Sequence, residues 1–170
     1  TPLHRRQVNF KNDGLYASIR HAATLKRGFL MGGIQMKLNL FDSHVHTEHS
    51  HDGQSSMEEI CAQAASRGVM GVAFTDHYEC DIPAQRLGVR DTLAELPRFQ
   101  RQYQGRIRLT RGIELGQGHL YPEVAEEILG SEKFDLVLGS VHTSAPGVDI
   151  GEINFNKPEV KVSAILEKYF

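Results

Sequence analysis

The sequence predicts an α/β protein with a parallel sheet, and three observations indicate this class. Four short apolar segments with the character of strands alternate with three segments of helical periodicity between residues 38 and 139. Such alternation is typical of repeated βαβ units, whose strands run parallel. The chain has 170 residues, of which 40% are hydrophobic and 24% charged. This length and composition are ordinary for a globular domain with a single core.

The first half of the domain carries clear boundary signals. A strand is expected over 38–46, followed by a helix that opens with the capping box Ser56-Met-Glu-Glu59 and ends at Gly68. The apolar positions of that helix include Cys61, which we expect in the core. An apolar run over 69–75 reads as a buried strand, and a loop is expected over 76–89.

The second half continues the alternation, with strands expected over 107–113 and 134–139 and helices over 91–103, 122–129 and 160–170. Pro97 is expected to start, kink or split the first of these helices, because proline lacks the backbone N–H. Pro122 suits the first turn of the next helix, and Gly130 suits its end.

The N-terminal region differs from the rest. Residues 1–35 have no clean helical or strand period, and patterning begins near Met36. We therefore expect 1–35 to be a weakly ordered or extraneous extension and 36–170 to be the domain proper.

Two cysteines at no metal spacing favour a reducing, cytoplasmic setting, and no apolar run is long enough to cross a membrane. The balance of 19 basic and 21 acidic residues gives no basic footprint for nucleic acid and argues against such a partner.

Nine histidines are about twice the usual number, and their placement predicts a metal site. Each expected strand ends in residues of metal-ligand type, where parallel α/β folds build their sites. His44 and His46 lie two apart and so share one strand face. The candidate ligands are His44, His46, Asp52, His77, Glu114 and His142. Imidazole and carboxylate donors without thiolate suit zinc, manganese or iron.

Other polar residues near these positions have supporting interpretations. Asp42 and Asp76 each adjoin a candidate ligand and are candidates for orienting an imidazole. Candidates for substrate contact are Arg86, Arg90 and His119, although solvated loop positions are the simpler interpretation for all three. His49 and His51 are expected to be solvated loop residues.

Four sequence blocks resemble the PHP (polymerase and histidinol phosphatase) superfamily, and most closely its stand-alone histidinol-phosphatases. The blocks are Asp42-Ser-His-Val-His46 through Asp52-Gly53, Phe74-Thr-Asp-His77, Gly112-Ile-Glu-Leu-Gly116, and Phe134-Asp135 through Gly139-Ser-Val-His142. The resemblance covers residues 36–170. It implies a distorted (β/α)7 barrel of TIM-like type, of which about four βα units are present here.

The resemblance also implies three metal ions and a division of the ligands among them. His44 and His46 would bind the first ion, Glu114 would bridge the first and second, and His142 would bind the second. Asp52 and His77 would bind the third. The family's later Asp-x-His motif has no counterpart after His142, so we expect a truncated chain or an incomplete site.

The expected activity is that of a metal-dependent phosphoesterase that cleaves a phosphate monoester with a metal-bridging hydroxide. L-histidinol phosphate, an intermediate of histidine biosynthesis, is the leading substrate. One alternative is a nucleotide phosphatase or exonuclease of the same superfamily. The other is a non-catalytic, metal-binding remnant of a barrel. The sequence leaves the metal, the oligomeric state and the leaving group open.

Overall fold

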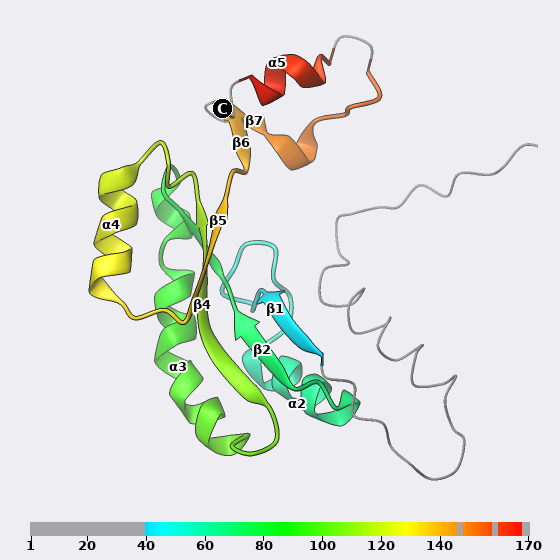
Figure 1. Cartoon of the computed structure of the whole chain (residues 1–170), viewed down its shortest axis with the longest axis vertical. Helices are drawn as coiled ribbons and strands as arrows, with labels where there is room; N and C mark the ends of the chain where they lie inside the picture. The colour runs from blue at the N-terminus through cyan, green and yellow to red at the C-terminus, as the bar shows by residue number, and fades with distance from the viewer. Residues whose placement is uncertain (1–39, 146–147, 158–159, 168–170) are drawn as a thin grey trace, which may run out of the picture.

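The computed structural model describes residues 40–145, 148–157 and 160–167, and its main feature is a parallel sheet with helices packed on it (Figure 1). The sheet strands are β1 (Phe41–Val45), β2 (Gly71–Phe74), β3 (His77–Glu79), β4 (Arg108–Gly116) and β5 (Leu136–Ser140). β1 pairs with β2, β2 and β3 pair in succession with one edge of β4, and β5 pairs with the other edge. Every one of these pairings is parallel, so the predicted class is confirmed.

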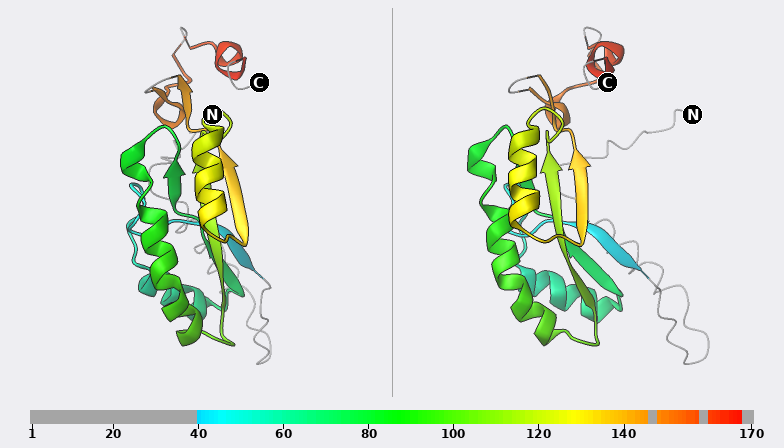
Figure 2. Two further views of the ribbon diagram at one scale, coloured as in Figure 1. Left: turned by 90° about the vertical axis from the view of Figure 1, so that its left-hand side faces the viewer. Right: turned by 60° about the vertical axis from the view of Figure 1, so that its left-hand side comes forward.

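Three helices cover the same face of this sheet: α2 (Met57–Arg67), α3 (Gly88–Gln102) and α4 (Pro122–Ser131). Figure 2 shows α3 and α4 against the central strands, with α2 across one end. Smaller elements complete the description, namely η1 (Pro83–Gln85), β6 (Thr143–Ala145), β7 (Val148–Asp149), η2 (Ile150–Glu152) and α5 (Val162–Leu166). None of the helices in the described ranges has the length and apolar character needed to cross a bilayer.

The start and end of α2 follow from local sequence as predicted. The Ser56 side chain accepts a hydrogen bond from the Glu59 backbone N–H at 3.3 Å, and a Glu59 carboxylate oxygen accepts one from the Ser56 N–H at 3.0 Å. Gly68 ends the helix in the left-handed conformation, with φ of 69°, and its N–H reaches the carbonyls of Ala64 and Ala65. The capping box and the C-terminal glycine are both confirmed.

Two features of the segment between β2 and β4 differ from the sequence-based expectation. The expected loop over 76–89 contains the strand β3, whose three residues continue along β4 after a break at Thr75 and Asp76. These three residues are too few and too polar for their pattern to predict a strand. They form one because β4 supplies the backbone pairing. The helix α3 runs through Pro97 without interruption. Burial of Leu96 and Phe99 on either side of Pro97 offsets the lost backbone hydrogen bond.

Other boundaries shift slightly. Gly130 lies inside α4 and does not end it. The last helix, expected over 160–170, is described only as Val162–Leu166. The proposed extension over 1–35 and the first residues of the expected strand over 38–46 lie outside the described residues.

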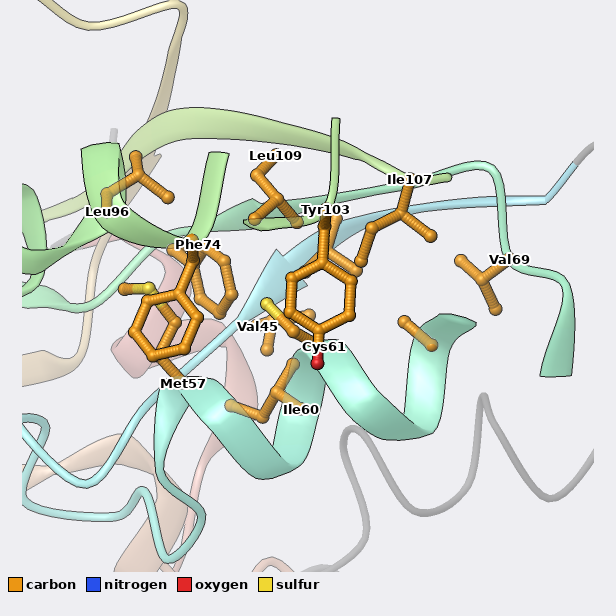
Figure 3. Packing of buried hydrophobic residues seen from close by; sticks show 13 residues of the cluster. Val45, Met57, Ile60, Cys61, Val69, Phe74, Leu96, Tyr103, Ile107 and Leu109 are labelled. Atoms are coloured by element: carbon orange, nitrogen blue, oxygen red, sulfur yellow. The ribbon is translucent and has the colours of Figure 1, made fainter. Parts of the chain in front are cut away.

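Alternation along the strands divides core from site. Leu109 of β4 and the β2 residues Val72 and Phe74 point to the helices, and they pack in a core with α2 and α3 (Figure 3). The members of this cluster include Val45, Met57, Ile60, Cys61, Val72, Phe74, Leu96, Phe99 and Leu109. A second cluster joins α3, α4 and the upper part of β4. Because neighbouring side chains on a strand point to opposite faces, the positions between these apolar residues project onto the free face of the sheet.

Candidate metal centre

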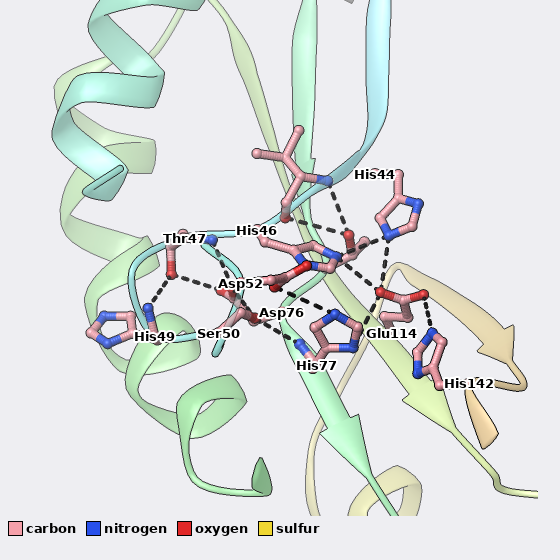
Figure 4. A network of polar contacts seen from close by, with 12 residues as sticks. His44, His46, Thr47, His49, Ser50, Asp52, Asp76, His77, Glu114 and His142 are labelled. Carbon is pink, nitrogen blue, oxygen red and sulfur yellow. Dashed lines mark hydrogen bonds and ion pairs between the residues drawn. The ribbon is translucent and has the colours of Figure 1, made fainter. Parts of the chain in front are cut away.

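The predicted ligands meet on the sheet face that the helices do not cover, at the carboxyl ends of the strands. They come from five places along the chain: β1 and the residue after it, the following loop, β3, β4 and the segment after β5. Figure 4 shows their imidazoles and carboxylates pointing toward one another. The structure therefore brings together all six residues that the sequence singled out: His44, His46, Asp52, His77, Glu114 and His142.

Glu114, near the end of β4, is the centre of this cluster. Its side chain is 5% exposed, and its two oxygens contact different imidazoles. Oε2 lies 3.0 Å from His44 Nε2 and 2.9 Å from His46 Nε2, while Oε1 lies 3.1 Å from His142 Nε2. The Ser140 hydroxyl donates a hydrogen bond to Oε1 at 2.6 Å. One carboxylate thus links ligands from both sides of β4.

A second group forms around Asp52, on the loop after β1. Asp52 Oδ1 lies 2.9 Å from His46 Nδ1 and 3.5 Å from His77 Nε2. The rings of His46 and His77 meet edge to face, with centroids 4.3 Å apart. Asp52 is half-exposed whereas His77 is buried, so this group opens toward solvent through the carboxylate.

The electrostatics of the cluster favour ionised carboxylates and protonated imidazoles when no metal is present. Burial raises the pKa of Glu114, but hydrogen bonds from His142, His44, His46 and Ser140 outweigh it and hold that pKa well below its usual range. Burial lowers the pKa of His46, but hydrogen bonds to Asp52 and Glu114 raise it to about 9. Bonds to Glu114 and Glu79 raise the pKa of His142 to about 10, despite its burial.

The donors fit a divalent metal centre. Three groups each bring three ligand atoms within 4.8 Å of one another: His44 with His46 and Glu114, His46 with Asp52 and His77, and His77 with Glu79 and His142. In the first group, the separations between ligand atoms are 2.9 to 3.0 Å. Donors around one tetrahedral zinc lie about 3.3–3.5 Å apart, so a small adjustment would allow all three to share an ion.

Glu79, on β3, is a site residue that the sequence analysis missed. Its carboxylate is 3% exposed, and Oε1 lies 2.9 Å from His77 Nδ1 and 2.7 Å from His142 Nδ1. The available signal was its spacing two residues after His77, the same spacing that identified His44 and His46. Residues two apart share a face only on a strand, so the expectation of a loop over 76–89 hid this signal.

The two aspartates expected to orient imidazoles make other contacts. Asp76 is buried and accepts hydrogen bonds from the Thr47 backbone and hydroxyl and from the Ser50 and Thr92 hydroxyls. Asp42 Oδ1 receives a long bond of 3.4 Å from the His44 backbone N–H. Among the described residues, Glu79 is the carboxylate that contacts the Nδ1 atoms of both His77 and His142, because it lies on the same strand face as His77.

The predicted substrate-contact residues are not gathered at the cluster. Arg86 donates to the backbone carbonyls of Glu79 and Cys80, so its guanidinium is held beside β3. Arg90 and His119 are exposed on α3 and on the turn after β4, respectively.

The sequence predicts both His49 and His51 to be solvated loop residues. The His49 ring is instead bonded to Glu95 at 2.9 Å, while His51 is exposed with its ring 4.7 Å from that of His77.

A curled parallel sheet with histidines and acids at its carboxyl end defines the class, a partial βα barrel with a candidate metal centre. The PHP domain family matches residues 42–170, and the chain belongs to that family. It is 29% identical over 131 residues to a probable histidinol-phosphatase of Clostridium acetobutylicum, covering 77% of this chain and 49% of that protein. It is 28% identical over 126 residues to one of Deinococcus radiodurans, covering 71% and 46%.

A solved structure shows the same fold. Histidinol phosphate phosphatase from Lactococcus lactis, complexed with zinc, L-histidinol and phosphate, is 25% identical with a TM-score of 0.54, over 61% of this chain and 40% of that one. The chain thus spans about half or less of the length of the relatives it matches. The predicted resemblance to the PHP superfamily is confirmed, and so is the partial barrel.

Proposed function

We propose that the protein is a metal-dependent phosphatase that hydrolyses a phosphate monoester, with L-histidinol phosphate as its substrate. The observation that carries this proposal is the position of Glu114, whose two oxygens contact imidazoles from opposite sides of β4. A carboxylate placed in this way suits a bridge between neighbouring ions. The similarity to histidinol-phosphatases supports the substrate class.

The assignment of ligands follows these contacts. His44, His46 and Glu114 would hold one ion, and Glu114 with His142 would hold a second. Asp52 and His77 would contribute to a third. Zinc, manganese and iron all accept such donors. When bound, close-set divalent ions would draw charge from the phosphoryl oxygens, supply hydroxide near neutral pH and offset charge on the leaving oxygen.

The protein's own residues prepare this site in two ways. Ser140 donates a hydrogen bond to Glu114 Oε1, which fixes the orientation of the carboxylate between the imidazoles. Burial of Glu114 and His77 excludes water from one side of the cluster, whereas the half-exposed His44 and Asp52 leave the other side accessible to a substrate. Both described cysteines are free and buried, which supports a cytoplasmic setting as part of this proposal.

The direct test is phosphate release by the longest product of the natural reading frame, loaded in turn with zinc, manganese and ferrous iron. L-histidinol phosphate is compared with a panel of nucleotides. We expect release from L-histidinol phosphate that is lost in the His44→Ala/His46→Ala variant. Faster release from nucleotides would overturn the substrate. Unchanged release by the double variant, or no bound metal in the wild type, would overturn the metal-dependent mechanism.

A further inference from the structure

Glu79 occupies a special place in the cluster because one of its oxygens serves two imidazoles. Oε1 lies 2.7 Å from His142 Nδ1 and 2.9 Å from His77 Nδ1, and both separations are hydrogen-bond distances. His77 lies on β3, whereas His142 follows β5 on the far side of β4. The carboxylate therefore links two rings from segments that do not pair with each other.

The other nitrogen of each ring faces a different carboxylate. His142 Nε2 lies 3.1 Å from Glu114 Oε1, and His77 Nε2 lies 3.5 Å from Asp52 Oδ1. His77 Nδ1 also lies 3.4 Å from Glu114 Oε2, but Glu79 is its nearer partner. A neutral imidazole that donates from Nδ1 keeps its lone pair at Nε2. Bonding to Glu79 thus directs both lone pairs toward the proposed metal positions.

The backbone of β4 leaves just enough room for this carboxylate. Glu79 and Gly116 are partners in the register of β3 and β4. A Cβ atom at Gly116 would lie 1.9 Å from Glu79 Oε2 and 2.5 Å from its Cδ, which no side chain could tolerate without displacing the carboxylate. The absence of a side chain at residue 116 is therefore a condition for the position of Glu79.

We infer that Glu79 is a positioning residue that holds His77 and His142 with Nδ1 protonated and Nε2 free to bind metal, and so couples two ion positions. This inference rests on the metal centre of the proposed function. Ligating histidines commonly donate their second ring N–H to a carboxylate, which fixes the orientation of the ring. The competing arrangement, in which Glu79 itself shares an ion with the two Nδ1 atoms, requires the opposite tautomer of both rings.

The tautomers can be read directly by NMR of the zinc-loaded protein labelled with ¹⁵N-histidine. Long-range proton–nitrogen correlations identify which ring nitrogen carries hydrogen and which binds metal. We expect Nδ1–H with Nε2 bound to zinc for both His77 and His142. Zinc bound at Nδ1 of either ring would overturn the inference. This measurement uses the wild-type protein and so does not depend on a variant that folds.

Variants test the same role through metal affinity, measured by competition with a chelator. Glu79→Gln keeps an acceptor oxygen, and we expect it to retain all ions and to lose less affinity than Glu79→Ala. Glu79→Ala is expected to weaken the ions at His77 and His142 by about 10- to 100-fold, the usual range for such partners. The ion at His44 and His46 should keep its affinity. Equal losses in both variants, or none in Glu79→Ala, would contradict the inference.

Gly116→Ala keeps the carboxylate but displaces it, so it should reproduce the loss seen in Glu79→Ala. The matched control is Gly130→Ala in α4, where an added Cβ meets nothing within 4 Å. Wild-type affinity in Gly116→Ala would count against the inference. A protein with the expected tautomers that hydrolyses no phosphate ester would overturn the proposed function alone. An active protein with zinc at Nδ1 would overturn the role of Glu79 alone.

Discussion

Two polar clusters lie within a few residues of each other after the end of β2, one around Asp76 and one around Glu79 and Glu114, and they differ in kind. Asp76 accepts hydrogen bonds from one backbone N–H and three hydroxyls, so every partner is a donor. Glu114 and Glu79 contact imidazoles, and each of these imidazoles also contacts a further imidazole or carboxylate. The first cluster is complete as a set of hydrogen bonds, whereas the second requires extra protons or metal ions to balance its donors and acceptors.

The difference suggests separate tasks. Asp76 ties the loop after β1 to α3 through Thr47, Ser50 and Thr92, and the Ser50 hydroxyl accepts a hydrogen bond from the His77 N–H at 2.9 Å. This cluster supports the backbone from which the ligands project. The imidazole cluster contributes chemistry, and its outer members are accessible to solvent. Changes in the first should therefore affect stability, and changes in the second should affect metal binding and activity.

The largest effect is expected from His44→Ala. Loss of one imidazole from the Glu114 group should lower metal-dependent phosphate release by about 10³-fold, equivalent to about 4 kcal/mol. Because the His44 side chain is half-exposed, the free energy of unfolding of the metal-free protein should change by less than about 0.5 kcal/mol. Phosphate assays and denaturant titrations measure the two quantities. A large loss of stability with activity preserved would reverse the proposed division.

Asp76→Ala should show the opposite balance. It leaves four buried donors without their acceptor, so the free energy of unfolding should fall by about 3 kcal/mol. Denaturant unfolding of the metal-free protein measures this loss. Asp42→Ala is the matched control, because the bond that Asp42 accepts among the described residues is a long one from a backbone N–H. Equal stability of the two variants would contradict the supporting role of Asp76.

Metal binding should depend on pH in a definite direction. In the metal-free protein, His46 has a pKa of about 9 and His142 one of about 10, so both rings carry a second proton at pH 7. An incoming ion must displace these protons, and apparent affinity should rise about tenfold per pH unit for each proton displaced, or about 1.4 kcal/mol. Calorimetry in buffers of different ionisation enthalpy counts the protons. Affinity that stays constant between pH 6 and pH 8 would contradict this expectation.

The smallest effect is expected from the cap of α2, remote from both clusters. Ser56→Ala removes the side-chain acceptor of the capping box and should cost about 1 kcal/mol of stability. Metal affinity should be unchanged, since α2 contributes no ligand. Thermal unfolding and the chelator competition provide the two measurements. A change in metal affinity would show that the helix and the site are coupled more closely than their contacts indicate.

Much of the fold followed from local sequence. The Ser56 and Gly68 signals bound α2 correctly, and the alternation of strands and helices predicted the parallel sheet. The ligand candidates at strand ends were predicted because parallel strands carry their carboxyl ends to one edge. Local pattern failed for β3 and for Pro97. In both cases tertiary contacts, the pairing with β4 and the burial of α3, outweigh what the nearby residues prefer.

Sequence patterns alone placed His44, His46, Glu114 and His142 at the ends of strands, because residue spacing within a strand is regular and local. The partnership of Glu79 with His77 and His142 depended on the register of β3 against β4 and on the empty space at Gly116. The sequence predicted that Asp76 would orient an imidazole, whereas Glu79 contacts the imidazoles, and this difference has the same origin. A side chain's neighbours across a sheet are set by pairing between distant segments, which local spacing does not encode.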